Sequence, residues 1–208
     1  MMTTRELIIE KALDLFSEKG YQGTSVKNIA DAVGIKDSSL YKHFTSKKEI
    51  FDTIVAEMSE RMKSMSDDLG LPDDRDMETA AQKYATLTEQ GLEKLSIEIF
   101  LFYMRDAFAS RFRHMLTIEQ YQNREIYQVY RELFMEAAIQ YQSLLFQEMI
   151  RQGAFEEANP KMMALYFYAP IFFLLNKYDQ EPEKEEEALE ELREHVREFG
   201  RIYGVKRS

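Results

Sequence analysis

The 208-residue sequence contains no cysteine, only 8 glycines and only 4 prolines. A chain without cysteine cannot form disulfides or zinc–thiolate sites. The low glycine and proline content argues against a disordered chain, a collagen-like repeat or a loop-rich β-sandwich. With 45% hydrophobic and 31% charged residues, the composition instead favours an ordered globular protein.

Long hydrophobic runs are also missing from the sequence. The longest, residues 162–175, is shorter than the roughly 20 apolar residues that a helix needs to cross a bilayer. The N-terminus lacks the basic-then-apolar pattern of a secretory signal. We therefore expect a soluble, cytoplasmic protein that does not bind membranes.

The net charge of −10 is unevenly distributed along the chain. Residues 1–50 hold eight Lys or Arg and seven Asp or Glu, whereas the remaining residues hold nineteen and thirty. Within the first part, residues 42–48 contain three lysines and no acid. Charges more than about 10 Å apart are largely screened at cellular ionic strength, so this basic segment can act on nucleic acid despite the acidic remainder.

Helical periodicity dominates the whole chain, and no alternating strand pattern competes with it. Thr3 with Glu6 forms a capping-box pattern, Gly20 ends the helix that follows, and Ser25 is the expected N-cap of the next one. Later helices are expected at residues 46–65, 77–87, 97–108, 118–151, from 159 onward and at 183–203. We predict an all-α protein of about nine helices. Its parts are a three-helix helix-turn-helix DNA-binding domain (residues 1–47) and a larger helical ligand-binding and dimerisation domain (residues 48–208).

Residues 26–44 have the spacing of a helix-turn-helix. Ala30 falls where two helices cross closely, and Gly34 falls at the turn, where a positive φ costs little only for glycine. A recognition helix would then run over residues 36–42. The buried positions between the helices are Ile29, Val33, Ile35 and Leu40. On spacing alone, an ordinary αα-hairpin is the alternative interpretation.

The segment from Leu13 to Phe51 carries many residues at fixed spacings. They are Phe16, Gly20-Tyr21, Thr24-Ser25-Val26, Ile29-Ala30, Gly34-Ile35, Leu40-Tyr41, His43-Phe44 and Ser46-Lys47-Lys48-Glu49. Together they resemble the N-terminal domain of the TetR family (tetracycline-repressor family) of transcriptional regulators, over the first quarter of the chain. The resemblance implies a DNA-binding domain followed by a helical body that dimerises and holds a ligand.

The resemblance also implies which residues bind DNA. Ser25, Tyr41 and Lys47 fall where the family contacts phosphates, and such contacts set the register on DNA without reading its sequence. The predicted DNA-binding set is Ser25, Lys27, Lys36, Asp37, Ser38, Ser39, Tyr41, Lys42, His43 and Lys47.

Four residues of this set, Lys27, Asp37, Ser38 and Lys42, fall where family members reach base edges. Lysine can donate to guanine and aspartate can accept from cytosine, while Ser39 fits a base or a phosphate. At residues 36–38 the sequence departs from the family's usual small hydroxylated cap followed by Lys-Gly. Asp37 therefore either reads a base or caps the recognition helix.

As a whole, the resemblance implies a regulator rather than an enzyme. We expect a homodimer that represses transcription from a palindromic double-stranded DNA operator and is released by a small hydrophobic or amphipathic effector. No cofactor and no metal are expected. The alternatives are an all-α enzyme and a helical adaptor that does not bind DNA. The sequence has no Gly-rich phosphate loop, HExxH or nucleophile-elbow motif to favour the enzyme.

Aromatic residues are concentrated in the middle of the chain. Effector pockets are mostly apolar with a few polar groups, which suits tyrosine and phenylalanine. We predict that the pocket is lined by Tyr103, Tyr127, Tyr130, Phe134 and Tyr166. The alternative is that most of these side chains belong to the hydrophobic core.

The last two predicted helices are the candidate dimer interface. The final helix carries a single apolar stripe at three- and four-residue steps, and the helix before it is apolar almost all round. We predict that they form a four-helix interface between two subunits. The interface residues would be Phe172, Leu189, Leu192, Val196 and Phe199. The alternative is that both helices close the core of the monomer.

Overall fold

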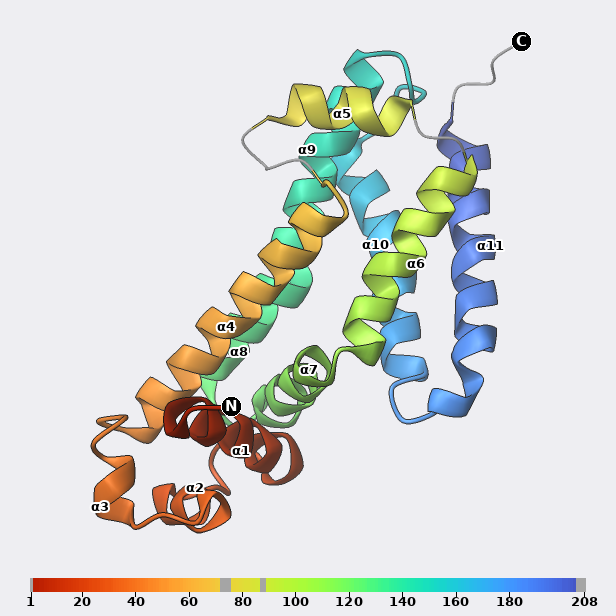
Figure 1. Cartoon of the computed structure of the whole chain (residues 1–208). Helices are drawn as coiled ribbons and strands as arrows, with labels where there is room; N and C mark the ends of the chain where they lie inside the picture. Colours follow the sequence, from red (N-terminus) through yellow and green to blue (C-terminus); the bar gives the residue numbers. More distant parts are fainter. Residues whose placement is uncertain (1, 72–75, 87–88, 205–208) are drawn as a thin grey trace. The chain divides into compact units, whose positions relative to one another are not determined.

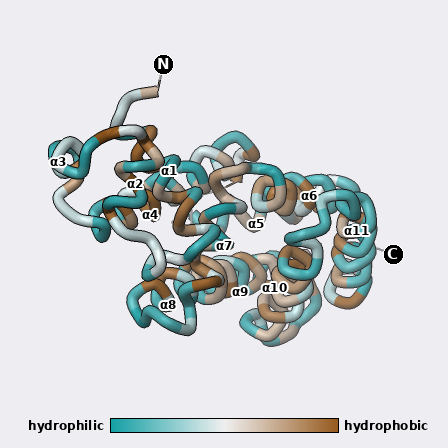
Figure 2. Tube along the Cα trace, turned by 90° about the horizontal axis from the view of Figure 1, so that it is seen from below, coloured by the Kyte–Doolittle hydropathy of each residue, from teal (hydrophilic) through white to brown (hydrophobic). Residues whose placement is uncertain are grey.

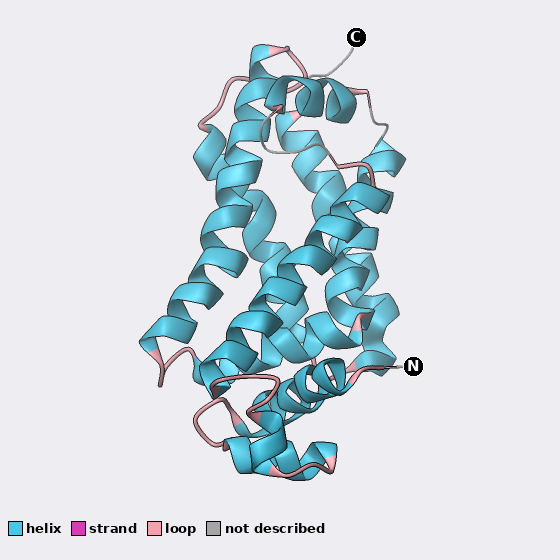
Figure 3. Ribbon diagram, turned by 60° about the vertical axis from the view of Figure 1, so that its left-hand side comes forward, coloured by secondary structure: helices cyan, strands magenta, loops and turns pink. Residues whose placement is uncertain are grey.

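The computed structural model describes residues 2–71, 76–86 and 89–204. Within these ranges helices are joined by turns and loops, and no strand forms (Figure 3). The predicted all-α class is confirmed. None of the described helices combines the length and apolarity that crossing a bilayer requires.

The helices are labelled in chain order in Figure 1. They are α1 (Thr4–Lys19), α2 (Val26–Val33), α3 (Asp37–Leu40), α4 (Lys47–Asp68), α5 (Met77–Ala85), α6 (Glu89–Arg105), α7 (Ala107–Glu119), α8 (Arg124–Arg131), α9 (Ala137–Arg151), α10 (Pro160–Lys177) and α11 (Glu185–Tyr203). A π-helical turn, η1 (Glu132–Glu136), joins α8 to α9, and a 3₁₀ turn, η2 (Pro182–Lys184), precedes α11.

The chain forms two compact units. Unit 1 comprises Met1–Ser64 and Arg105–Arg131, so it holds α1 to α3, most of α4, and α7 with α8. Unit 2 comprises Met65–Met104 and Glu132–Ser208. The predicted boundary between residues 47 and 48 separates a DNA-binding domain from a ligand-binding domain. A division into compact units does not test where these two roles lie, so this boundary stays a prediction.

Unit 1 is built around α1. The predicted capping box starts this helix, because the Glu6 N–H donates to Thr3 Oγ1 (3.3 Å) and the Thr3 N–H donates to Glu6 Oε2 (2.7 Å). The apolar face of α1 is buried, and α1 packs against both α2 and α7. Charged side chains add to this packing, since Arg111 of α7 pairs with Glu10 and Asp14 of α1. These contacts join α7 to the helix-turn-helix.

Unit 2 has two apolar clusters. One is formed by α5, α9, α10 and Phe199 of α11, and the other by α6, α10 and the rest of the α11 stripe. In α11 the hydrophobic residues recur among charged ones, so brown and teal alternate along its tube (Figure 2). The buried stripe of α11 therefore closes the core of unit 2.

The single helix predicted over residues 118–151 is wrong. In the structure α7 ends at Glu119, and α8 begins after Asn123, whose Oδ1 accepts from the backbone N–H groups of Glu125 (3.0 Å) and Ile126 (3.3 Å). Helix 97–108 is likewise interrupted, because Asp106 caps α7 by accepting from the Ala109 N–H (2.8 Å). Short polar side chains offer such N–H groups a partner, and so they start new helices inside an apolar pattern that looks continuous.

Candidate nucleic-acid interface

The helix-turn-helix forms where the spacing predicts it. Ser25 and Asn28 make a capping box at the start of α2, with the Asn28 N–H donating to Ser25 Oγ (3.1 Å). Ala30 is fully buried, and Gly34 follows α2 with φ +79°, the left-handed conformation that favours glycine. The Ile35 N–H donates back to the Ala30 carbonyl (3.0 Å), which fixes the turn into α3.

Helix α3 lies at one end of unit 1 (Figure 1), and most of its polar residues are exposed. Leu40 is fully buried and anchors the helix, whereas Tyr41 keeps 53% of its surface exposed. Asp37 is the first residue of α3, and no side-chain hydrogen bond caps this helix. The predicted residues that are exposed here are Ser25, Lys27, Lys36, Asp37, Ser38, Tyr41, Lys42 and His43, while Ser39 is partly buried.

Lys47 is directed into the protein. Its Nζ donates to the carbonyls of Tyr21 (2.7 Å) and Thr24 (2.8 Å) and lies 4.2 Å from the centre of the Tyr21 ring. Partial burial of the ammonium lowers the pKa of Lys47. Of the three N–H donors that a lysine carries, one remains for a phosphate.

Lys48 is exposed but ion-paired. Its Nζ lies 2.7 Å from Glu125 of α8 and 2.9 Å from Asp52 of its own helix. Hydrogen bonds to Glu125 and Asp52 raise the pKa of Lys48. By contrast, Lys27, Lys36 and Lys42 have no ion-pair partner among the residues that the structure describes. Three unpaired positive charges of the domain therefore lie on α2 and around α3.

Of the five predicted pocket residues, the structure brings two together. The rings of Tyr103 and Phe134 lie 6.0 Å apart in unit 2, and burial raises the pKa of Tyr103 to about 12. Tyr130 is buried in unit 1. Tyr127 and Tyr166 are 39% and 53% exposed, so neither lines an enclosed pocket within the chain.

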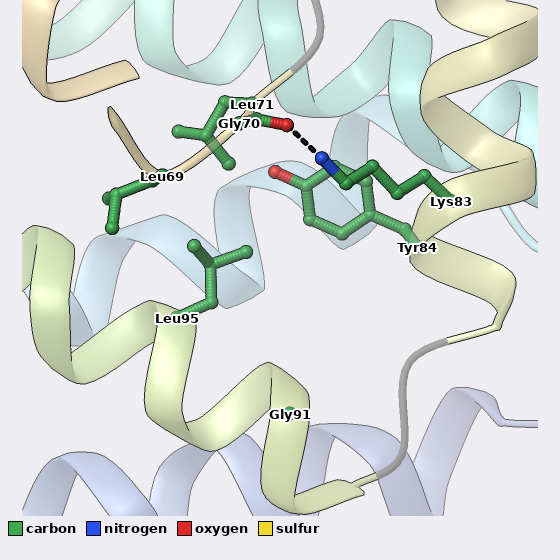
Figure 4. A pocket seen from close by; sticks show the side chains of 7 residues that line it. All are labelled: Leu69, Gly70, Leu71, Lys83, Tyr84, Gly91 and Leu95. Atoms are coloured by element: carbon green, nitrogen blue, oxygen red, sulfur yellow. Dashed lines mark hydrogen bonds between the residues drawn. The ribbon is translucent and has the colours of Figure 1, made fainter. Parts of the chain in front are cut away.

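A small, partly open cavity of about 90 Å³ lies elsewhere in unit 2. It is lined by Leu69, Gly70, Leu71, Lys83, Tyr84, Gly91 and Leu95, which come from the turn after α4, from α5 and from α6 (Figure 4). Lys83 Nζ donates to the Gly70 carbonyl across it. None of these residues belongs to the predicted pocket set. The apolar residues Leu69 and Leu71, either side of Gly70, are the sequence signal for this segment, and both are partly buried.

Most of the predicted interface residues lie in the core. Leu192 is fully buried, and Leu189, Val196 and Phe199 are at most 6% exposed within the single chain. Phe199 packs against the rings of Phe167 (4.9 Å between centroids), Phe146 and Tyr203. Burial within the single chain fits the alternative interpretation for these four residues, and their place in a dimer interface stays a prediction. Their spacing required burial, but spacing cannot distinguish burial within a chain from burial between chains.

A different apolar face is left exposed on α10. Met162 (38%), Leu165 (40%), Tyr166 (53%) and Phe173 (62%) all expose large side chains. Except for the adjacent pair 165–166, their separations are three, four, seven, eight and eleven residues, so they lie along one side of the helix. We call this set the α10 stripe. Phe172, the remaining predicted interface residue, is partly buried beside it.

Comparison with known proteins identifies the region that contains the helix-turn-helix. Residues 8–54 match the family described as "Bacterial regulatory proteins, tetR family". The biofilm operon icaADBC HTH-type negative transcriptional regulator IcaR of Staphylococcus aureus is 53% identical to this chain over 51 residues. The helix-turn-helix domain belongs to the tetR family. The similarity to IcaR covers 24% of this chain and 27% of the relative, so it is confined to the tetR domain.

Solved structures resemble the whole chain, tetR domain included. The flavonoid-responsive regulator FrrA matches with a TM-score of 0.64 and 22% identity, covering 98% of both chains. SmeT, the repressor of the multidrug efflux pump SmeDEF of Stenotrophomonas maltophilia, matches with a TM-score of 0.64 and 20% identity, covering 98% of this chain and 92% of SmeT. A SmeT–triclosan complex also matches. At these identities the likeness shows a shared fold.

Proposed function

We propose that the chain is a transcriptional repressor that binds an operator through α2 and α3. The observation that carries the proposal is the exposed, polar α3 of a tetR domain, flanked by three lysines without ion-pair partners. Lysines that are not neutralised within the protein can release counterions from DNA, which supplies most non-specific affinity. Such a protein works on DNA inside the cell, so we also propose a cytoplasmic location.

Sequence recognition is assigned to the side chains of α3 and its flanks. Lys42 would donate to guanine O6 or N7, and Asp37, which makes no capping hydrogen bond, would accept from cytosine N4. Ser25 and Tyr41 would hold phosphates, joined by the remaining N–H of Lys47. The residues in these proposed contacts occupy the positions at which the TetR resemblance implies DNA contacts. The negative regulator IcaR, similar over the same region, supports repression as the outcome.

We further propose that the regulator is a homodimer joined through the α10 stripe. The stripe exposes four large apolar side chains, and a soluble monomer gains by covering such a surface. A two-fold interface would make the two copies of α3 read the two halves of a palindromic operator. We therefore propose the outer side of α10, in place of the buried stripe of α11, as the dimer interface.

The effector is proposed to be a small hydrophobic or amphipathic molecule bound in unit 2. The leucines and Tyr84 around the cavity of Figure 4 supply apolar contacts, and Lys83 supplies a polar group at its edge. Among the structural relatives, SmeT has been solved with triclosan and FrrA is flavonoid-responsive. Release of DNA would follow if the effector binds more tightly to a conformation that no longer fits the operator.

The test starts from a pool of duplex DNA with a randomised core. The wild-type protein should enrich one palindromic sequence, and its affinity for that duplex is then compared with a scrambled duplex. Lys42→Ala should lose about 1–3 kcal/mol per half-site and relax the preference at one base position. Lys48→Ala is the matched control. It removes the same charge, but its ion pairs already neutralise that charge, so affinity should stay within about twofold.

Two results would contradict the proposal. Failure of the folded wild-type protein to enrich any sequence would exclude an operator-binding function and favour a helical adaptor or an all-α enzyme. Equal effects of Lys42→Ala and Lys48→Ala on affinity would show that α3 is not the surface that meets the bases.

A further inference from the structure

The turn between α1 and α2, residues 20–24, determines where the helix-turn-helix begins. It precedes Ser25, the N-cap of α2, with no residue between. Within the turn, Thr24 is buried and its Oγ1 donates to the Gly20 carbonyl (2.9 Å). Any displacement of this turn therefore moves the start of α2.

One side of the turn is held by Glu119, the last residue of α7. Its side chain is 2% exposed, and its Oε1 accepts from the Gln22 backbone N–H (2.9 Å). The approach is close, because a Cβ added to Gly20 would collide with the same oxygen. Glutamate is rarely so buried unless it has a specific partner, and here the partner of Oε1 is the backbone N–H of Gln22 in the turn.

The other side of the turn is held by Lys47, the first residue of α4. Its ammonium donates to the carbonyls of Tyr21 and Thr24, on either side of Gln22. The Tyr21 ring packs beneath it, between Phe16 (5.2 Å) and Phe51 (5.5 Å). The negative charge of Glu119 also acts on Lys47 and favours its protonated form. Glu119 and Lys47 thus hold three backbone polar groups of the turn, the Gln22 N–H and the carbonyls of Tyr21 and Thr24.

We propose that Glu119 is a positioning residue for DNA binding: from the end of α7 it fixes the start of α2 through the Gln22 N–H. This inference rests on the proposed function, because α2 and α3 are taken to bind DNA. Glu119 lies 97 residues after Gln22 in the sequence. If the inference holds, α7 and α4 together fix the position of the helix-turn-helix. Glu119 itself need not touch DNA.

The experiment separates the hydrogen bond from packing. Glu119→Leu keeps a side chain of similar size without an acceptor, Glu119→Asp keeps the charge but withdraws the carboxylate, and Glu119→Gln keeps an acceptor at the same reach. Amide hydrogen exchange of residues 20–24 is measured in the DNA-free full chain, and affinity is measured for the duplex selected by the wild type. The matched control is Arg111→Met, which removes the α1–α7 ion pairs but leaves the turn untouched.

The proposal predicts a particular pattern. Exchange of the Gln22 amide should be about tenfold faster in Glu119→Leu and in Glu119→Asp, and affinity should fall about tenfold for the selected duplex. Glu119→Gln should restore both to within about threefold of wild type. Arg111→Met should lower the unfolding temperature without speeding exchange at Gln22.

Three outcomes would overturn it. Wild-type exchange at Gln22 in folded Glu119→Leu or Glu119→Asp would show that the hydrogen bond does not hold the turn. Faster exchange with unchanged DNA affinity would show that the position of α2 does not limit binding. If Glu119→Gln failed to restore either property, the role of Glu119 would lie in its charge. Absence of any selected duplex, with exchange at Gln22 accelerated as predicted, would instead identify a failure of the proposed function.

Discussion

Two glycines of the helix-turn-helix differ in what a side chain would meet. At Gly34 the φ of +79° is the left-handed conformation, and an added Cβ finds nothing within 4 Å. At Gly20 the backbone has φ 76° and ψ 161°, and the Cβ would collide with Glu119. Gly34→Ala should therefore cost about 1 kcal/mol of unfolding free energy, and Gly20→Ala clearly more. Urea unfolding of both variants measures this order, and equal costs would show that the approach of Glu119 is unimportant.

The buried phenol of Tyr103 makes a prediction about pH. Burial raises the pKa of Tyr103 from 10.0 to about 12, so the folded state favours the neutral phenol. The stabilisation is fully present below pH 10, the pKa of the unfolded chain, and is lost as the pH rises toward 12. In Tyr103→Phe the fall in unfolding free energy between these pH values should be smaller by about 2 kcal/mol. Parallel curves for wild type and variant in alkaline urea titrations would contradict the assignment.

At the scale of elements, α11 is predicted to stabilise unit 2. Phe199 contacts four aromatic rings within 6.0 Å. Phe199→Ala should cost about 3–5 kcal/mol because it leaves a cavity among rings that cannot collapse into it. The control is Ile202→Ala on the same helix, which is 65% exposed and should change stability by at most about 0.5 kcal/mol. Similar urea midpoints for the two variants would show that α11 is not part of the core.

Local signals in the sequence predicted elements well where the cap lies within a few residues of the helix. The Thr3–Glu6 box, the N-cap Ser25 and the turn at Gly34 all follow from side chains that satisfy nearby backbone groups. The break at Asn123 was missed because a capping residue inside an apolar repeat looks like any exposed position. The α1–α7 ion pairs, the Glu119 contact and the cavity join residues far apart in sequence, which periodicity does not encode.

For the whole molecule, the decisive question is which apolar surface joins two subunits. Phe173→Glu places a charge on the α10 stripe, where the side chain is 62% exposed in the single chain. It should convert the dimer to a monomer that remains folded, as seen by sedimentation velocity and circular dichroism. Leu192→Glu should instead unfold unit 2, because a charge at a fully buried position costs several kcal/mol.

The opposite result would restore the original interface. A Phe173→Glu protein that stayed dimeric, together with a Leu192→Glu protein that folded as a monomer, would place the contact on α11. Operator affinity should follow dimerisation in either case, because a single helix-turn-helix reads only half of a palindrome. Measuring affinity and mass on the same samples links the two properties.

The ion pair between Lys48 and Glu125 also has a consequence for how the protein searches a genome. A lysine neutralised within its own domain adds little to the attraction for random DNA. Weak non-specific attraction shortens the residence time of the protein on unrelated DNA and leaves a larger fraction of the protein free to bind the operator. Removing the acid, as in Glu125→Gln, should make the regulator linger on unrelated DNA and slow its arrival at the operator.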